Sequence, residues 1–181
     1  MMSRRKFYTA DPHFGHTNIM RFCNRPFSSV EEMDATLIAN WRRVVRPDDE
    51  VYLLGDFSFK GNKHPQAYLD QLPGQIHFIW GNHDPDRVRQ LSGWASSQPY
   101  LEIRDGEDDI TLLHYAMRVW NKSHFGALHF FGHTHAQLPG NDQSVDVGVD
   151  YPAWNFTPVD LETIKAHLAT LPAYEGRIRK D

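Results

Sequence analysis

Short apolar runs alternate with segments of helical periodicity in the first half of the chain, whereas the second half consists mostly of apolar runs. Their β-branched and aromatic content predicts strands over residues 6–10, 50–54, 76–80, 100–104, 110–114, 128–131 and 144–149. Met33, Leu37, Ile38, Trp41 and Val44 recur at helical spacing and predict a helix over about residues 31–45. Further helices are predicted over 64–72, 85–91 and 158–171.

Local signals support several of these boundaries. The sequence from Ser28 to Glu32 is typical of a capping box, and Asp160 is a candidate N-cap for the last helix. The Asp105-Gly106 pair favours a hairpin between two strands. Strands that first alternate with helices and then follow one another predict an α/β fold, with two packed sheets and helices outside. We find no repeat or linker, and therefore expect one domain over residues 1–181.

Five of the predicted strands end in side chains that can bind metal. Each such side chain, taken alone, is more often a strand-end cap or a core histidine. Independent caps, however, would not all be residues whose side chains bind metal ions. All donors are oxygen or imidazole, which suits intermediate divalent ions: manganese first, then iron, nickel, cobalt or zinc. The set is large enough for two ions if one carboxylate bridges them, and such pairs clamp phosphoryl oxygens. The candidates are Asp11, His13, Asp56, Asn82, His114, His133 and His135.

Composition limits which binding partners and which cellular compartment are expected. The 181 residues include 11 histidines, an unusual number, and one cysteine, which excludes an intrachain disulfide or a thiolate zinc cluster. The net charge of -4 counts against long nucleic acid as a partner. No apolar run is long enough to span a bilayer, and no signal peptide precedes the first strand. We expect a soluble, cytoplasmic protein without membrane contact.

In their order, the motifs resemble those of the calcineurin-like metallophosphoesterases, especially small stand-alone bacterial members. The blocks are Asp11-Pro12-His13, Gly55-Asp56, Gly81-Asn82-His83-Asp84, His114 and Gly132-His133-Thr134-His135. The resemblance implies a four-layer α/β/β/α sandwich and two metal ions. It also implies that Asp11, His13 and His135 hold one ion, that Asn82, His114 and His133 hold the other, and that Asp56 bridges them. His83 would assist the leaving group, oriented by Asp84.

The expected activity is hydrolysis of a small phosphodiester or nucleotide, by in-line attack of a hydroxide that bridges the two metals. Phe57-Ser58-Phe59 follows Asp56 where protein phosphatases carry a second aspartate and an arginine, which argues against a protein substrate. Candidate phosphate contacts are His16, Asn18, Arg25 and Arg118. We assign structural or surface roles to His64, His77, His124, His129 and His167. Two alternatives remain open: a non-catalytic scaffold that binds proteins, and a DNA or RNA nuclease.

Overall fold

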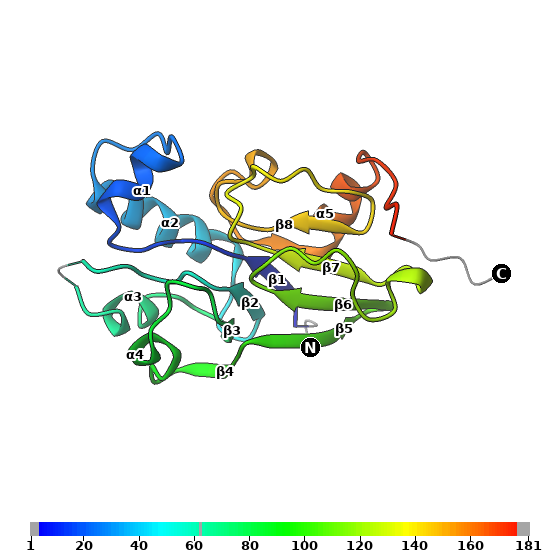
Figure 1. Ribbon diagram of the computed structural model, residues 1–181. Coiled ribbons are helices and arrows are strands. Elements are labelled where there is room, and N and C mark those ends of the chain that lie inside the picture. The colour runs from blue at the N-terminus through cyan, green and yellow to red at the C-terminus, as the bar shows by residue number, and fades with distance from the viewer. Residues whose placement is uncertain (1–3, 62, 177–181) are drawn as a thin grey trace.

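Two β-sheets pack face to face in the computed structural model, which describes residues 4–61 and 63–176 (Figure 1). The first sheet has the strand order β4-β3-β2-β1-β9. Strands β1 to β4 run parallel, and β9 pairs antiparallel with β1. These strands are β1 (Lys6–Thr9), β2 (Glu50–Leu54), β3 (Gln75–Ile79), β4 (Trp94–Gln98) and β9 (Val159–Asp160).

The second sheet has the order β5-β6-β7-β8. Strands β5 and β6 form the antiparallel hairpin predicted from Asp105-Gly106, whereas β6, β7 and β8 run parallel. The strands are β5 (Tyr100–Asp105), β6 (Asp108–Leu113), β7 (Leu128–Phe131) and β8 (Ser144–Asp146). Parallel strands deliver their carboxyl ends to one edge, and this edge is where the polar motifs begin.

Helices α1 to α4 cover the face of the first sheet that points away from the second sheet (Figure 1). Alternation along β1 shows the arrangement: Phe7 packs with the helices, while Tyr8 packs toward the second sheet. The helices are α1 (Thr17–Phe22), α2 (Val30–Val44), α3 (Gln66–Leu69), α4 (Asp86–Arg89) and α5 (Leu161–Leu168), with 3-10 turns η1 (Ser123–Phe125) and η2 (Pro152–Trp154). The fold is therefore the predicted α/β class, two stacked sheets flanked by helices.

The outer face of the second sheet is covered differently. The loop that includes η1 brings Trp120 against His129 of β7, with ring centroids 5.3 Å apart, and Tyr174 packs on Trp120. The loop that includes η1 and the segment around Tyr174 thus cover this face of β7. No helix among the described residues is both long and apolar enough to cross a lipid bilayer.

Several boundaries differ from the sequence predictions. Strand β4 and helix α1 were not predicted, because Ala95, Ser96 and Ser97 carry little strand propensity and α1 is only 6 residues long. The last helix begins later than residue 158, because Val159 and Asp160 first pair with β1. Asp160 then caps α5, accepting a hydrogen bond from the Thr163 amide, and Ser29 caps α2 in the same way, so both predicted caps are confirmed.

Candidate metal centre

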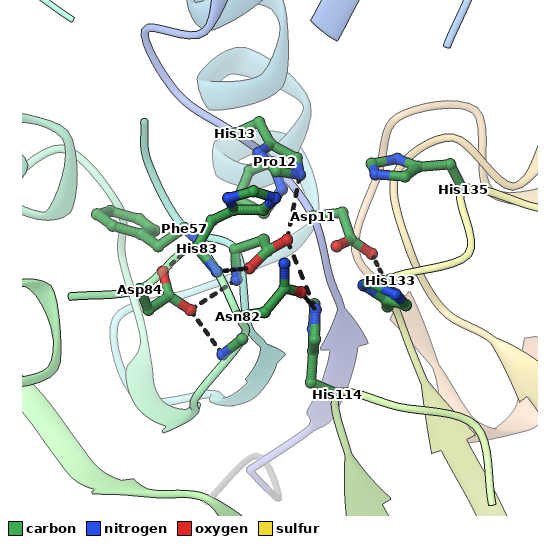
Figure 2. A network of polar contacts seen from close by, with 12 residues as sticks. Asp11, Pro12, His13, Phe57, Asn82, His83, Asp84, His114, His133 and His135 are labelled. Carbon is green, nitrogen blue, oxygen red and sulfur yellow. Dashed lines mark hydrogen bonds and ion pairs between the residues drawn. The ribbon is translucent and has the colours of Figure 1, made fainter. Parts of the chain in front are cut away.

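The polar strand ends converge in one place, at the carboxyl edge of the parallel strands (Figure 2). The candidate ligands form two groups there, each with donor atoms within 4.8 Å of one another, and a third group of this kind joins His135 to Cys23 and Asp150. The first group is Asp11, His13 and His135; the second is Asp56, His114 and His133. The first group is the first set that the resemblance implies, and the second group shares His114 and His133 with the second set but contains Asp56, the expected bridge, in place of Asn82.

Asp56 belongs to the second group and also lies next to the first. Its Oδ2 atom is 3.5 Å from Nε2 of His13 in the first group and 3.5 Å from Nε2 of His114 in the second. Two donors on one tetrahedral ion are separated by roughly 3.4 Å when each bond is about 2.1 Å. Asn82 joins the second group, because its Oδ1 is 3.0 Å from Nε2 of His114. One carboxylate oxygen is therefore close to both places where an ion would lie.

Several buried polar atoms in the first group have no partner within the chain. Oδ1 of Asp11 and both ring nitrogens of His13 are buried without a hydrogen bond. Burial raises the pKa of Asp11 to about 8 and lowers the pKa of His13 to about 3, so without an ion the carboxyl group is mostly protonated at pH 7 and the imidazole is neutral. Native proteins rarely leave such groups unsatisfied. A divalent cation would satisfy Oδ1 of Asp11 and the unprotonated ring nitrogen of His13, so the residues fit a metal ion.

The carboxyl group of Asp56 stays ionised despite its position. Burial by itself would raise the pKa of Asp56, but its contact with His114 and the nearby charges lower the pKa to about 2. Its second oxygen, Oδ1, accepts the His83 backbone N–H at 2.9 Å. Oδ2 is thereby directed toward the two histidines.

Outer partners orient two of the histidine rings. Nδ1 of His114 lies 2.7 Å from the Leu54 carbonyl oxygen and must donate to it, so Nε2 is the nitrogen that would bind an ion. Burial alone would lower the pKa of His114, but the contact with Asp56 and nearby charges raise it to about 9, so an ion would have to displace the proton on Nε2. Nδ1 of His135 lies 2.7 Å from Oδ2 of Asp150. Burial alone would lower the pKa of His135, but the hydrogen bond with Asp150 and nearby charges raise it to about 10. This is the carboxylate–histidine pairing that commonly supports a metal ligand.

Asp150 and Asp146 belong to this site, and the sequence analysis missed both. Asp146 is fully buried and holds the loop after β7, accepting hydrogen bonds from Thr134 Oγ1 at 2.6 Å and from the Ala136 amide at 3.0 Å. Asp150 directly follows the predicted strand over 144–149. The same strand-end rule that selected the other carboxylates would have found it.

The backbone at the site is left-handed at most of the candidate ligands. Positive φ angles occur at Asp11 (57°), His13 (50°), Asp56 (54°), His133 (68°) and His135 (47°). Each costs of order 1–3 kcal/mol for a residue with a side chain, so the surroundings must compensate. Hydrogen bonds between loops do so: the Asp11 amide donates to the Gly55 carbonyl, and the His13 amide donates to the Asp56 carbonyl.

Glycines beneath the ligands allow this close packing. A Cβ atom on Gly81 would lie 2.2 Å from Oδ1 of Asp56, and one on Gly132 would lie 2.5 Å from Oδ2 of Asp11. Contacts that short do not occur, so a side chain at either position would displace a candidate ligand.

His83 is exposed at the rim of the site and outside both ligand groups (Figure 2). Its ring centroid lies 5.7 Å from that of His13 and 5.6 Å from that of Phe59. The ring thus borders the metal site on one side and a cavity on the other, which is lined by Phe59, Asn82 and His83 among others.

The orienting role expected of Asp84 needs correction. Its carboxylate is buried and accepts three backbone N–H bonds, from Asp56 at 2.7 Å, Phe57 at 2.9 Å and Gly81 at 2.7 Å. The reason is local: the turns after β2 and β3 place these amides side by side without backbone acceptors. Asp84 joins two strand ends and does not hold the His83 ring.

Arg25 also departs from its expected role as a phosphate contact. Its side chain is 0% exposed, and its guanidinium makes a bidentate ion pair with Asp150 at 2.7 and 2.8 Å. The remaining donors reach the carbonyls of Asp11 and Pro12 and the sulfur of Met33. With every nitrogen donating within the chain, Arg25 positions the first ligand loop and has no donor left for a substrate.

The other expected substrate contacts lie in different places. His16 is half-buried next to the site, with its ring stacked 4.1 Å from Phe59 and 5.5 Å from His13. Asn18 is exposed on α1. Arg118 is exposed and lines a separate cavity of about 520 Å³ together with Leu138 and Tyr174. Their roles in substrate binding stay predictions.

Comparison with known proteins places the chain among relatives of similar length. No family model matches. The uncharacterized protein MJ1445 of Methanocaldococcus jannaschii is 38% identical over 175 residues, which cover 90% of this chain and 91% of that protein. The gene 66 protein of Mycobacterium phage L5 is 42% identical over 182 residues, covering 82% of this chain and 86% of that protein.

Among solved structures, a protein of unknown function from Aquifex aeolicus, AQ665, has a TM-score of 0.72 at 20% identity and covers 91% of this chain and 100% of its own. This likeness shows a shared fold. A weaker one, with a TM-score of 0.45 at 17% identity over 80% of this chain and 78% of the other, is to Yfce, a phosphoesterase from E. coli, and is too distant for an argument about function. The relationship in sequence is decisive: the chain belongs to the same family as the M. jannaschii protein MJ1445 and the gene 66 protein of phage L5.

Proposed function

We propose that the protein is a hydrolase of small phosphate esters that uses two divalent metal ions, with manganese as the first choice. The observation that carries this proposal is the position of Asp56, whose Oδ2 lies 3.5 Å from a histidine of each ligand group. A shared carboxylate is what a pair of ions about 3.5 to 4 Å apart requires. The motif resemblance to metallophosphoesterases supports the same function.

Each ligand group has a defined task in this mechanism. Asp11, His13 and His135 would hold one ion, and Asn82, His114 and His133 the other, with Asp56 contributing to both. When bound, two such ions supply charge neutralisation at phosphoryl oxygens and an acidic water molecule. Substrate would enter from the side of Asn82, His83 and His133, the exposed members of the site.

His83 would act on the leaving group. It belongs to neither ligand group and is exposed at the rim, while its backbone N–H fixes Asp56. Its imidazole would donate a proton to the departing oxygen as the P–O bond breaks. General acid help of this kind is typically worth about a hundredfold to ten-thousandfold in rate, and most for strongly basic alkoxides.

The variant His83→Ala tests this assignment. It should keep both metal ions and lose far more activity on an alkyl or nucleoside ester than on a nitrophenyl ester of the same phosphate, since nitrophenolate departs without a proton. The measurement is kcat/KM across leaving groups of rising pKa, with metal content determined in parallel. Equal losses on all esters would instead place His83 at a phosphoryl oxygen, and loss of an ion would make it a ligand.

A panel of phosphomonoesters and phosphodiesters, assayed with several divalent metals, tests the function itself. We expect turnover that depends on added metal and disappears with chelator. No turnover with any metal would favour a protein-binding scaffold that retains the fold.

A further inference from the structure

A cavity of about 610 Å³ opens beside the candidate metal centre and shares Asn82 and His83 with it. Its other walls carry three cationic side chains, Lys60, Arg87 and Arg89. This local excess of positive charge stands out in a chain whose net charge is -4. The cavity lies on the side of the centre where His83 is. In the proposed function, His83 acts on the leaving group, so the leaving group would lie on this side.

The acidic residues of the cavity do not neutralise these cations. The carboxylate of Asp84 is buried and is bound by three backbone N–H groups. The side chain of Asp86 is 84% exposed and approaches only Arg89, at 3.6 Å. Neither Lys60 nor Arg87 has an ion-pair partner among the residues that the structure describes. Two cations are therefore free for a ligand.

Two polar groups on the cavity wall also lack partners. Ser58 is 3% exposed, and its buried hydroxyl makes no hydrogen bond. The Nε atom of Arg89 is likewise buried without an acceptor, while the guanidinium is held 4.7 Å above the Trp80 ring. Buried hydroxyl and guanidinium groups without acceptors are uncommon in native proteins. Together with the free cations, they provide donors suited to an anion with several oxygens.

We propose that this cavity binds a second phosphate, carried by the leaving group of the substrate. The inference rests on the proposed function and names its substrate class: an ester whose departing alcohol is itself phosphorylated. In the reaction, water adds to the scissile phosphorus and releases a proton to solvent, the bond from phosphorus to the leaving oxygen breaks, and that oxygen takes a proton from His83, which solvent then replaces. There are two products. One is the phosphate that carries the oxygen from water, and the other is an alcohol that retains its own phosphate in the cavity.

Matched substrates test this directly. For monoesters the pair is propane-1,3-diol monophosphate and propane-1,3-diol bisphosphate. For diesters it is a dithymidine monophosphate with and without a terminal phosphate on the leaving nucleoside. The wild-type protein with manganese should have a kcat/KM at least about tenfold higher for the member with the second phosphate, the usual scale of one or two charge-assisted contacts.

Variants locate the effect. Arg87→Ala and Lys60→Ala should each reduce kcat/KM about tenfold for the doubly phosphorylated ester and less than about twofold for its partner. Ser58→Ala should act in the same direction with a smaller effect. The control is Lys165→Ala, which removes one positive charge from an exposed site on α5 that pairs with Asp108 and should leave both values unchanged.

The outcomes separate the two claims. Turnover without preference for the second phosphate, or equal losses on both esters in the Arg87 and Lys60 variants, overturns the inference and leaves the phosphoesterase function standing. Absence of turnover on every ester with every metal overturns both.

Discussion

At the scale of single residues, the candidate ligands combine ordinary side chains with an uncommon backbone. Asp11, His13 and Asp56 adopt positive φ angles that turn their side chains toward a common point. Left-handed conformations are disfavoured for residues with a Cβ atom and tend to occur where function requires them. The strain is compensated by buried hydrogen bonds and by glycines that leave room below the ligands.

Substitution of Gly81 tests the steric part of this account. Gly81→Ala should displace the Asp56 carboxylate, because the new Cβ would lie 2.2 Å from Oδ1. Metal affinity should fall by at least about tenfold, the usual effect of disturbing an outer support. Elemental analysis after dialysis against a metal buffer measures this. Gly106→Ala is the control, since nothing lies within 4 Å of the Cβ atom that it would add. Equal metal content in both variants would contradict the prediction.

A second residue-scale prediction concerns His129, which is buried with Nδ1 3.0 Å from the Thr111 carbonyl oxygen and Nε2 accepting from the Met117 amide. Burial lowers the pKa of His129 from 6.5 to about 4. Because the folded-state pKa is the lower one, the unfolded chain takes up the proton first as pH falls. The protein should therefore lose up to about 3 kcal/mol of unfolding free energy between about pH 6.5 and pH 4.

The measurement is urea denaturation across this pH range. His129→Gln should lower stability at pH 7 but flatten its dependence on pH, because the titrating group is gone. His124→Gln, at an exposed position of η1, should leave the slope as in the wild type. An unchanged slope in the His129 variant would show that other groups cause the dependence.

At the scale of elements, the site is a set of turns held together by carboxylates that bind backbone. Asp84 joins the turns after β2 and β3, and Asp146 holds the loop after β7. The sequence predicts which side chains lie at these strand ends, because each follows an apolar run that can be recognised from a few neighbouring residues. It does not predict which carboxylate binds a backbone amide, as for Asp84, because that depends on turns from separate strands meeting in space. Strand β9 was missed for the same reason, since Val159 and Asp160 are ordered by pairing with β1.

Asp84→Asn should destabilise the protein by about 2–4 kcal/mol, because an amide N–H would face the backbone donors that the carboxylate now accepts. Metal binding should weaken as well, since the Asp56 amide is one of those donors. Urea denaturation and metal titration give the two values. The neighbouring Asp86→Asn, whose side chain is 84% exposed, should change stability by less than about 0.5 kcal/mol. Similar small effects in both variants would show that Asp84 does not hold these turns.

At the scale of the whole molecule, the site lies beside hydrophobic clusters that contain none of the candidate ligands. One hydrophobic cluster lies between the first sheet and helices α1 to α4, and another lies between the two sheets, with α5 packed on it. Both consist of buried apolar side chains, with Phe78 and Phe130 among the largest. This part of the fold follows from apolar periodicity, which is why the sequence predicts it.

Removal of metal by a chelator should leave the far-UV circular dichroism nearly unchanged while abolishing activity. The melting temperature should fall, because ligand binding to the folded state adds about 2.7 kcal/mol at a free metal concentration one hundred times Kd. Thermal scans with and without chelator, followed by readdition of manganese, measure both effects. Global loss of the circular dichroism signal on chelation would show that the metal is needed for folding, as in zinc fingers.

The buried ion pair between Arg25 and Asp150 has a consequence for biosynthesis. Its partners are 125 positions apart, and the hydrogen bond from the His133 amide to Asp11 spans 122. A chain emerging from the ribosome therefore presents its first ligand loop long before the residues that support it. Contacts of such long range form late, so metal loading should follow translation and not accompany it. Nascent chains arrested before Asp150 emerges should retain little metal, whatever the supply of ions in the cell.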